Sequence, residues 1–226
     1  MSTSTSDIKC EILSEEQSQF DLCFKLIVIG DCNVGKSSLI IKAIKNYFED
    51  LYSPTVGFEF LSFHIKISDQ KIKLQIWDTC GQELYRSLIT NFYRNTSLAL
   101  IVYAINNEDS FKDIDMWLKE LRTHASPDVK VFLIGNKIDL ENERKVTKEQ
   151  GEEFSKKNCI NKFTETSAKN GINAQSTFIE IAYLLYQDFS KFKEDEISKE
   201  SVGSISSGEN GRRRLTHRNK NAGCGC

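Results

Sequence analysis

The stretch "GDCNVGKS", Gly30 to Ser37, decides which fold this chain of 226 residues is expected to adopt. It comes directly after the apolar run "CFKLIVIG" at 23–30, which is typical of a buried strand. It opens "GKSSLIIKAIKNYF" at 35–48, whose apolar residues recur at helical spacing. Its letters match G-x-x-x-x-G-K-[ST], a turn whose backbone N–H groups point inward at phosphate. The sequence therefore predicts a phosphate-binding loop between a strand and a helix.

The side chains of this loop have separate predicted tasks. Gly30 and Gly35 let the backbone curl, and the N-terminus of the following helix adds its positive end. Lys36 is expected to reach the outer phosphates, and the hydroxyl of Ser37 to ligate Mg²⁺. Given the roughly 7% background frequency of glycine, a chance match in a chain of this length is of order 1%. An incidental lysine in a strand–helix turn is the weaker alternative.

Composition limits the other classes of function. Formal net charge is −2, from 30 Lys and Arg against 32 Asp and Glu, and gives no bulk electrostatic reason to expect a nucleic-acid polymer as partner. The longest apolar runs, "LIVIG" from Leu26 and "LALIVYAI" from Leu98, are far shorter than the roughly 20 residues that span a bilayer. Seven cysteines form an odd number without a pairing framework or a secretory signal, so free thiols are expected.

Three regions differ in composition. Residues 1–22 are Ser/Thr-rich and then acidic, which predicts a disordered extension, and residues 191–226 are too polar to bury enough surface to fold. Between them, in 23–190, short apolar runs alternate with amphipathic helical patterns. This alternation predicts an α/β fold, with a mostly parallel sheet of six strands and helices on both faces. The runs "FEFLSFHIKI" and "KIKLQIW", separated by the polar turn "SDQ", predict one hairpin.

A second motif, "GNKID" at 135–139, indicates which base is bound. It follows the buried strand "VKVFLI" and so lies at the carboxyl edge of the sheet, where ligands bind in such folds. A carboxylate accepts two parallel N–H bonds. Guanine offers that pair on N1 and the 2-amino group, whereas adenine does not. Asp139 is therefore expected to select guanine, with Asn136 serving the other edge of the base.

A third stretch, "TSAKN" at 166–170, ends the next strand of the pattern. Its position predicts that it meets the same base from the other side. The backbone N–H of Ala168 is expected to donate to the guanine carbonyl, while the stems of Lys137 and Lys169 cover the ring faces. Together, the three stretches predict one guanine-nucleotide site.

At this point the chain resembles a Ras-superfamily small GTPase, and within it a Rab protein, over roughly residues 23–190. "YSPTVGFEF" resembles the first switch segment and "WDTCGQE" the D-x-x-G-Q switch. "GFEF", "KLQIWDT", "ELYRSL", "NFYRNT" and "IVYAINNEDSF" look Rab-type. The resemblance implies the P-loop small-GTPase fold, binding of GTP and GDP with Mg²⁺, and slow GTP hydrolysis that needs an activating protein. It also implies a switch that recruits effectors for vesicle traffic in the GTP state and is reset by an exchange factor.

The resemblance assigns roles to individual residues. It implies that Gln82 orients the attacking water and is the catalytic residue, and that Mg²⁺ is held by Ser37, Thr55 and Asp78. The implied nucleotide contacts are Asn33, Val34, Gly35, Lys36, Ser37, Ser38, Phe48, Thr55, Gly81, Asn136, Lys137, Asp139, Ser167, Ala168 and Lys169. The aromatic residues Phe60, Trp77 and Phe92 match the family's effector-binding triad, with plain hairpin packing as the alternative.

Two cysteines depart from the family pattern. Cys80 stands where relatives usually carry Ala, and Cys32 occupies a loop position that is often small and polar. Both are expected near the γ-phosphate, which puts the hydrolysis rate in doubt more than nucleotide binding. A nucleotide-locked scaffold is therefore one competing interpretation. A Ras-like signalling switch is another, because it shares all the nucleotide chemistry.

The last six residues, "NAGCGC", place two cysteines, Cys224 and Cys226, near the end of the chain. The spacing alone allows a metal pair, a redox pair or a site for covalent lipid. Structural zinc needs four ligands, a redox pair is typically C-x-x-C, and a C-a-a-X box needs cysteine where Gly223 stands. A terminal C-x-C resembles the Rab signal for two geranylgeranyl groups, and two lipid signals anchor stably where one is marginal.

The resemblance finally implies where the protein works. A prenylated tail implies a prenyl-binding escort or GDP-dissociation inhibitor as a further partner. It also implies the cytoplasmic face of intracellular membranes as the location, with cycling through the cytosol. The run "RRRLTHRNK" before the cysteines adds five formal cations, each worth about 1 kcal/mol near an anionic leaflet.

Overall fold

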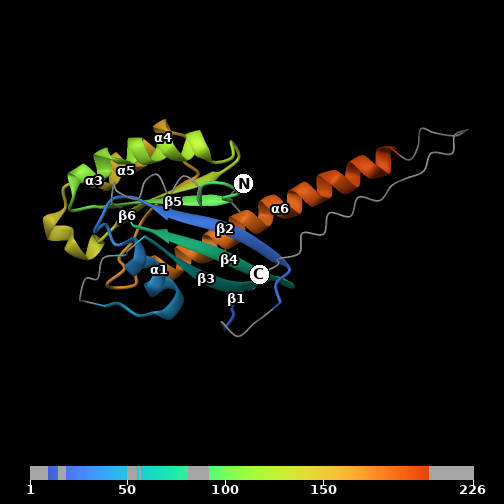
Figure 1. Cartoon of the computed structure of the whole chain (residues 1–226), viewed down its shortest axis with the longest axis horizontal. Coiled ribbons are helices and arrows are strands. Elements are labelled where there is room, and N and C mark those ends of the chain that lie inside the picture. The colour runs from blue at the N-terminus through green and yellow to red at the C-terminus, as the bar shows by residue number, and fades with distance from the viewer. Residues whose placement is uncertain (1–9, 15–18, 50–54, 56, 81–91, 204–226) are drawn as a thin grey trace, which may run out of the picture. The chain divides into compact units, whose positions relative to one another are not determined.

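The computed structural model describes residues 10–14, 19–49, 55, 57–80 and 92–203, with the side chains of 195–203 left out (Figure 1). The chain divides into two units, 1–187 and 188–226. The first unit is an α/β domain, as predicted. In the second, the described part is the continuation of the last helix, α6 (Ala174–Gly203).

The domain is built on a seven-stranded sheet with the order β1-β3-β4-β2-β5-β6-β7. The strands are β1 (Cys10–Ile12), β2 (Leu22–Ile29), β3 (Phe58–Ile67), β4 (Gln70–Thr79), β5 (Leu98–Ala104), β6 (Lys130–Asn136) and β7 (Lys162–Glu165). From β4 to β7 every pair is parallel, whereas β1–β3 and the hairpin β3–β4 are antiparallel. The parallel part brings the carboxyl ends of β2, β5, β6 and β7 to one edge.

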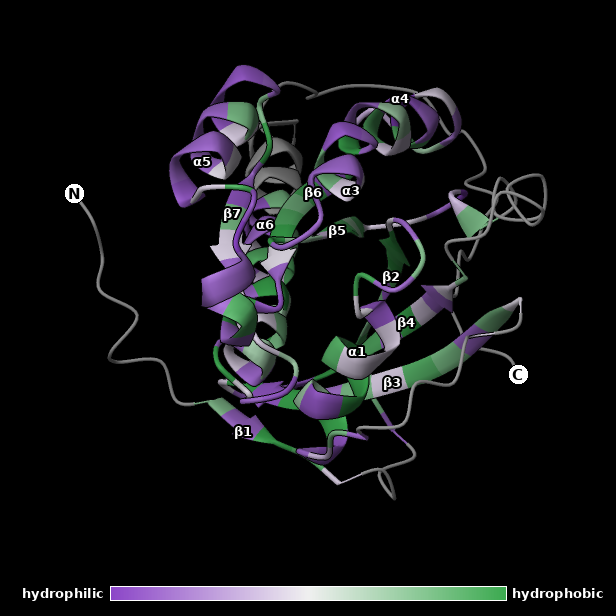
Figure 2. Cartoon of the chain, turned by 90° about the vertical axis from the view of Figure 1, so that its left-hand side faces the viewer, coloured by the Kyte–Doolittle hydropathy of each residue, from purple (hydrophilic) through white to green (hydrophobic). Residues whose placement is uncertain are grey.

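Helices cover both faces, because successive side chains of each central strand point to opposite sides. The helices besides α6 are α1 (Lys36–Lys45), α3 (Glu108–Lys112), α4 (Ile114–His124), the 3₁₀ helix η4 (Ile138–Glu143) and α5 (Lys148–Lys157). Leu26 and Val28 of β2 pack in one core with α1 and α6, and Ile27 and Ile29 pack in the other with α4. Figure 2 shows hydrophobic residues along β5 and β6 and hydrophilic residues over much of α5.

The N-terminal segment corrects two predictions. The sheet has seven strands instead of six, and 1–22 is not wholly unfolded, because Cys10–Ile12 pairs with Ile65–Ile67 at the edge of β3. The N–H of Leu13 donates to the carbonyl of His64 at 2.9 Å. An edge strand presents unpaired backbone groups that any nearby segment can satisfy. A three-residue strand is too short for its side-chain pattern to be recognised in the sequence.

The C-terminal helix corrects a third prediction. The polar segment from 191 was expected to be unfolded, yet the backbone of α6 is helical as far as Gly203. The stretch "KFKEDEISKESV" at 191–202 is rich in good helix formers and contains neither Gly nor Pro, so the helix continues until the glycine. Residues 204–226, with Cys224 and Cys226, lie outside the described residues.

Candidate functional site

The loop between β2 and α1 has the shape that the motif predicts. Gly30, Asn33 and Gly35 all have positive φ, of 137°, 59° and 91°. A Cβ on Gly30 would lie 2.1 Å from the carbonyl oxygen of Val102, and one on Gly35 would lie 2.5 Å from Asn136 Nδ2. Both positions therefore need glycine, for the backbone angle and for the close approach of neighbouring chain. The loop is held tightly against β5 and β6.

Lys36 crosses the inside of this loop. Its side chain is buried, and Nζ donates to the carbonyl oxygens of Gly30 at 2.9 Å and Asp31 at 2.7 Å. Burial lowers the pKa of Lys36, while the nearby carboxylate of Asp78 and thiol of Cys32 act in the opposite direction. Among the described residues, the hydrogen-bond acceptors of this buried ammonium group are carbonyl oxygens, so its positive charge is suited to an anion with several negative charges.

Three oxygen-bearing side chains meet beside the loop. Ser37 Oγ donates to Asp78 Oδ2 and lies 2.7 Å from Thr55 Oγ1. Asp78 is fully buried at the end of β4, and its Oδ1 has no hydrogen-bond partner among the described residues. Burial raises the pKa of Asp78 to about 6, although the bond from Ser37 and the charge of Lys36 act to lower it. Two hydroxyls and a carboxylate with a spare oxygen are hard donors that fit Mg²⁺.

The base-side loops come together at the same edge of the sheet. Asp139 lies in η4, just after β6, and Ser167 follows β7. Ser167 Oγ donates to Asp139 Oδ1 at 2.6 Å and accepts from the N–H of Asn170 at 3.0 Å. One carboxylate oxygen of Asp139 is thus held by the neighbouring loop. This bond fixes the rotamer of the side chain that is expected to select guanine.

Asn136 joins the phosphate side to the base side. It is buried, and its Nδ2 donates to the carbonyl oxygens of Val34 at 2.9 Å and Gly35 at 3.4 Å. Its Oδ1 accepts from Thr166 Oγ1 at 3.1 Å and from the N–H of Ala168 at 3.2 Å. These four bonds use the amide's donors and its acceptor. These bonds fix the position of Asn136 between the two loops and engage the N–H of Ala168 in this structure, while the contact of Asn136 with the edge of the base stays a prediction.

The remaining predicted contacts are placed as follows. Lys137 adopts a left-handed conformation at the start of η4, and its Cε would lie 4.0 Å from a Cβ on Gly35, so its stem lies over the phosphate loop. Lys169 is exposed, Ser38 is half-buried in α1, and Phe48 is half-buried against the core under α1. Gly81 and Gln82 lie outside the described residues.

Comparison with known proteins decides the family. The Ras family model matches residues 25–187. The Ras-related protein Rab-8 of Diplobatis ommata is 38% identical over 188 residues, which cover 83% of this chain and 89% of that protein. The chain belongs to the Rab proteins of the Ras family.

Membership fixes the general function. As a Rab protein, the chain binds GTP and GDP with Mg²⁺, hydrolyses GTP, and acts as a switch in vesicle traffic. Its partners are of the general classes that were expected: effectors, an exchange factor, an activating protein and a GDP-dissociation inhibitor. The interpretations as a nucleotide-locked scaffold or a Ras-like signalling switch are not favoured.

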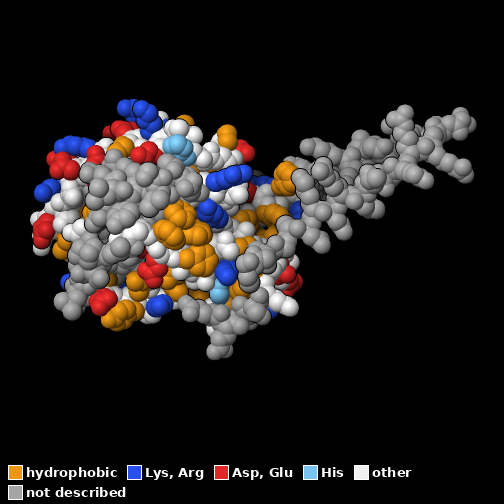
Figure 3. All heavy atoms as spheres, in the orientation of Figure 1, with side chains coloured by type: hydrophobic (Ala, Val, Ile, Leu, Met, Phe, Trp, Pro, Cys, Tyr) orange, Lys and Arg blue, Asp and Glu red, His pale blue; other side chains and the backbone are white. Residues whose placement is uncertain are grey.

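The aromatic triad of this Rab protein is a group of four. Phe60 and Trp77 face each other across the hairpin with ring centroids 5.3 Å apart, and Trp77 lies 4.9 Å from Phe92. Phe58, half exposed, lies 4.6 Å from Phe92 and 5.7 Å from Trp77. On the face shown in Figure 3, hydrophobic side chains gather beside Lys and Arg side chains. Phe58 and Phe60 are two residues apart on one strand, so their side chains lie on the same face of the sheet. This alternation was sufficient to predict from the sequence that Phe58 joins the other three aromatic residues.

Two cysteines of this Rab protein differ in exposure. Cys32 is exposed in the phosphate loop, whereas Cys80 is buried and donates its N–H to the carbonyl of Gly57 at 2.9 Å. Sequence reasoning missed a link from the same loop to α4, in which Trp117 Nε1 donates to Asp31 Oδ1 at 2.8 Å. A tryptophan at helical spacing is ordinarily read as core, so no signal in the sequence indicated this bond.

Proposed function

We propose that the two loops joined by Asn136 form one guanine-nucleotide site. The phosphates are held by the backbone of residues 33–38 and by the ammonium of Lys36. The base is held by Asp139, with the stems of Lys137 and Lys169 beside its ring and Phe48 at its edge. The observation that supports this assignment is the set of bonds from Asn136 to Val34 on one side and to Ala168 on the other, at 2.9 and 3.2 Å. Two loops that share one buried amide belong to one site.

Ser37, Thr55 and Asp78 are the residues that would hold Mg²⁺. Their oxygens already converge, and the spare oxygen of buried Asp78 supplies an acceptor without a partner among the described residues. When bound, the ion supplies positive charge at the outer phosphates. Ser37 and Thr55 would offer it neutral hydroxyl oxygens, and Asp78 would offer a carboxylate oxygen. Lys36 shares the same negative charge.

Gln82 is the proposed catalytic residue, with the task of orienting the attacking water, and Gly81 is proposed to donate to the γ-phosphate. Single-turnover GTP hydrolysis by purified protein tests the assignment. Gln82→Leu should slow hydrolysis and leave GTP affinity nearly unchanged. An unchanged rate in this variant would remove Gln82 from the mechanism, and a wild-type rate of zero would bring back the nucleotide-locked scaffold.

Effectors of this protein are proposed to dock on Phe58, Phe60, Trp77 and Phe92. Lys25 and Lys73 flank this aromatic surface, 5.6 Å from the ring of Trp77 and 6.0 Å from that of Phe60. Effectors with an apolar anchor and acidic neighbours are therefore the best match. Phe60→Ala should weaken capture of proteins that bind the GTP-loaded form, while GDP affinity stays unchanged.

The tail is proposed to carry two prenyl groups on Cys224 and Cys226, with 23–190 as the GTPase domain and 191–226 as the tail. The resulting location is the cytoplasmic face of intracellular membranes, with cycling through the cytosol. Within the part of the chain that the structure describes, no helix is long and apolar enough to cross a bilayer. Intact mass of native protein and fractionation of the Cys224→Ser/Cys226→Ser variant test the proposal. A native mass without lipid would contradict it.

A further inference from the structure

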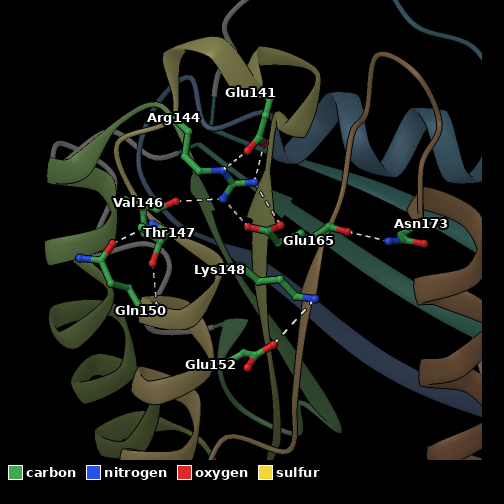
Figure 4. A network of polar contacts seen from close by, with 9 residues as sticks. All are labelled: Glu141, Arg144, Val146, Thr147, Lys148, Gln150, Glu152, Glu165 and Asn173. Atoms are coloured by element: carbon green, nitrogen blue, oxygen red, sulfur yellow. Dashed lines mark hydrogen bonds and ion pairs between the residues drawn. The ribbon is translucent and has the colours of Figure 1, made fainter.

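Arg144, the residue that follows η4, connects the two base-side loops from behind (Figure 4). Its Nη1 donates to Glu165 Oε1 at 2.6 Å, and its Nη2 to Glu165 Oε2 at 3.2 Å. Its Nε and Nη2 also donate to the two carboxylate oxygens of Glu141, at 2.8 and 2.7 Å. A further bond from Nη1 reaches the carbonyl oxygen of Val146 at 2.9 Å. All five N–H donors of the guanidinium are therefore used.

The Arg144–Glu165 pair differs from an ordinary surface ion pair. The side chains are only 17% and 13% exposed, and both planar groups meet in the forked geometry that gives the strongest hydrogen bonds between charged groups. Gly135 makes room for it, since a Cβ there would come 3.4 Å from Glu165 Cγ and 2.8 Å from Tyr103 Oη. The pair is thus packed against β6 immediately before Asn136.

The two ends of η4 are fastened to the same neighbouring loop. At its start, Ile138 N–H donates to the carbonyl of Thr166 at 3.2 Å, and Asp139 accepts from Ser167. At its end, Arg144 is fastened to Glu165, whose carbonyl oxygen also accepts from Asn173 Nδ2 at 2.8 Å. Asp139 therefore lies on a short segment that is bonded at both ends to the loop that carries Ser167. These bonds fix the distance between Asp139 and Ser167.

We propose that Arg144 is a positioning residue for guanine. Paired with Glu165, it fixes the segment that carries Asp139 against the loop that carries Ser167 and Ala168. It thereby sets the selectivity for the 2-amino group and the lifetime of the bound nucleotide. This inference rests on the proposed placement of the base at Asp139. Arg144 itself touches no reacting group, and it acts through the carboxylate that it holds in place.

The test compares GDP with IDP, whose base lacks the 2-amino group. Dissociation rates and affinities are measured with excess Mg²⁺ for wild type, Arg144→Met, Arg144→Lys and Glu165→Gln. We expect Arg144→Met to release GDP about tenfold faster, as the loss of one charged hydrogen bond would. The ratio of GDP affinity to IDP affinity should fall with it. Arg144→Lys keeps the charge without the fork and should lie between wild type and Arg144→Met.

Lys148→Met is the matched control. Lys148 pairs with Glu152 one turn further along α5 at 3.8 Å, and both side chains are exposed (Figure 4). Its GDP release should stay within about twofold of wild type, because exposed pairs contribute little. If Arg144→Met does not fold, Glu165→Gln, which keeps the shape and one acceptor, decides the matter in its place.

The outcomes separate cleanly. A falling GDP-to-IDP ratio in the Arg144 and Glu165 variants, with the control unchanged, supports the positioning role. Equal weakening of both nucleotides, or no change in either, overturns it, because a merely structural pair would not distinguish the bases. A wild-type protein that binds GDP no better than IDP or ADP contradicts the placement of guanine at Asp139 instead, independently of Arg144.

Discussion

The two halves of the nucleotide site are stabilised in opposite ways. On the phosphate side, Lys36 and Asp78 are buried charges whose pKa values are shifted toward the neutral form, and one oxygen of Asp78 is without a partner among the described residues. On the base side, buried Asn136 has a partner for each of its groups, and Asp139 is held by Ser167. The phosphate side depends on its ligand for compensating charge, whereas the base side holds its shape without one.

This difference suggests a division of labour. Charges that are desolvated in advance interact strongly with phosphates and Mg²⁺, because no water has to be removed from them on binding. Neutral, fully satisfied hydrogen bonds add less affinity, but they fix the acceptors that distinguish one base from another. We therefore expect affinity to come mainly from the phosphate side and selectivity from the base side.

The largest effect is expected from Lys36→Met. The substitution removes the ammonium group that is proposed to bind phosphate. The loss of two charged hydrogen bonds would correspond to about a thousandfold in affinity for both GTP and GDP. Titration with fluorescent GDP measures this loss. Lys45→Met, at the exposed end of the same helix, is the control and should bind normally. Affinity within tenfold of wild type in Lys36→Met would contradict the division of labour.

Asp78 gives the next effect, on stability against pH. Burial raises its pKa to about 6, so the nucleotide-free folded state binds this proton more tightly than the unfolded state does. The stabilisation is present below about pH 4 and is lost as the pH rises to about 6, by about 3 kcal/mol. The Tm of nucleotide-free protein should therefore fall over this range. GDP with Mg²⁺ should remove the fall.

Two variants check the assignment to Asp78. Asp78→Asn should flatten the profile, because the amide carries no charge in either state. Glu59→Gln, on the exposed strand position paired with Asp78, should leave most of the fall in place. If the Tm of wild-type protein does not change between pH 4 and pH 6, burying the carboxylate of Asp78 does not destabilise the fold. The phosphate side would then not differ from the base side in carrying an unfavourable buried charge.

Asp139→Asn tests the base side. The substitution replaces one acceptor oxygen with a donor, which opposes the 2-amino group of guanine but matches the C2 carbonyl of xanthine. GTP affinity should fall at least about tenfold while XTP affinity rises. Competition between the two nucleotides measures the exchange. Asp128→Asn, an exposed carboxylate away from the site, should keep the wild-type preference. A variant that still prefers GTP would place guanine recognition elsewhere.

The sequence predicted the elements that carry local signals. Strand β2, the glycine-rich turn from Gly30 and helix α1 were recognisable from local signals. An apolar run predicted the strand, two glycines and a lysine predicted the phosphate-binding turn, and apolar residues at helical spacing predicted the helix. The hairpin was recognisable from alternation around a polar turn. Asp139 was singled out because it follows a buried strand in a chain that also carries a phosphate loop, and because a carboxylate matches the two N–H groups of guanine.

What the sequence did not predict depends on contacts between distant segments. Strand β1 exists because the edge of β3 is open, which no local pattern of Cys10–Ile12 reports. The role of Asn136 follows from its position between Val34 and Ala168, which only the folded sheet brings together. The four bonds of Arg144 to the carboxylates of Glu141 and Glu165 are likewise invisible, because most arginines in such loops are solvated.

The smallest effect is expected from Asp31→Asn on the phosphate side. Burial raises the pKa of Asp31, the bond from Trp117 acts against this, and the carboxyl of Asp113 nearby raises it further. Because the folded pKa is raised, the charged form destabilises the fold as the pH increases from about 4. The amide keeps an acceptor for Trp117 and removes the repulsion. Its Tm should exceed that of wild type by about 1–2 °C at pH 7.5 and equal it at pH 4.

Asp115→Asn is the matched control for this change, since Asp115 is exposed in the first turn of α4 and should alter the Tm at neither pH. A higher Tm for Asp31→Asn at pH 7.5, without a difference at pH 4, would show that the charged carboxylate of Asp31 destabilises the fold. The phosphate loop would then carry an unfavourable charge at a residue that is not proposed to contact phosphate. A loss of stability at pH 7.5 would mean that the bond from Trp117 to a charged oxygen outweighs desolvation. The cost of burying charge in this half of the site would then be confined to Lys36 and Asp78, the residues that are proposed to bind the phosphates and Mg²⁺.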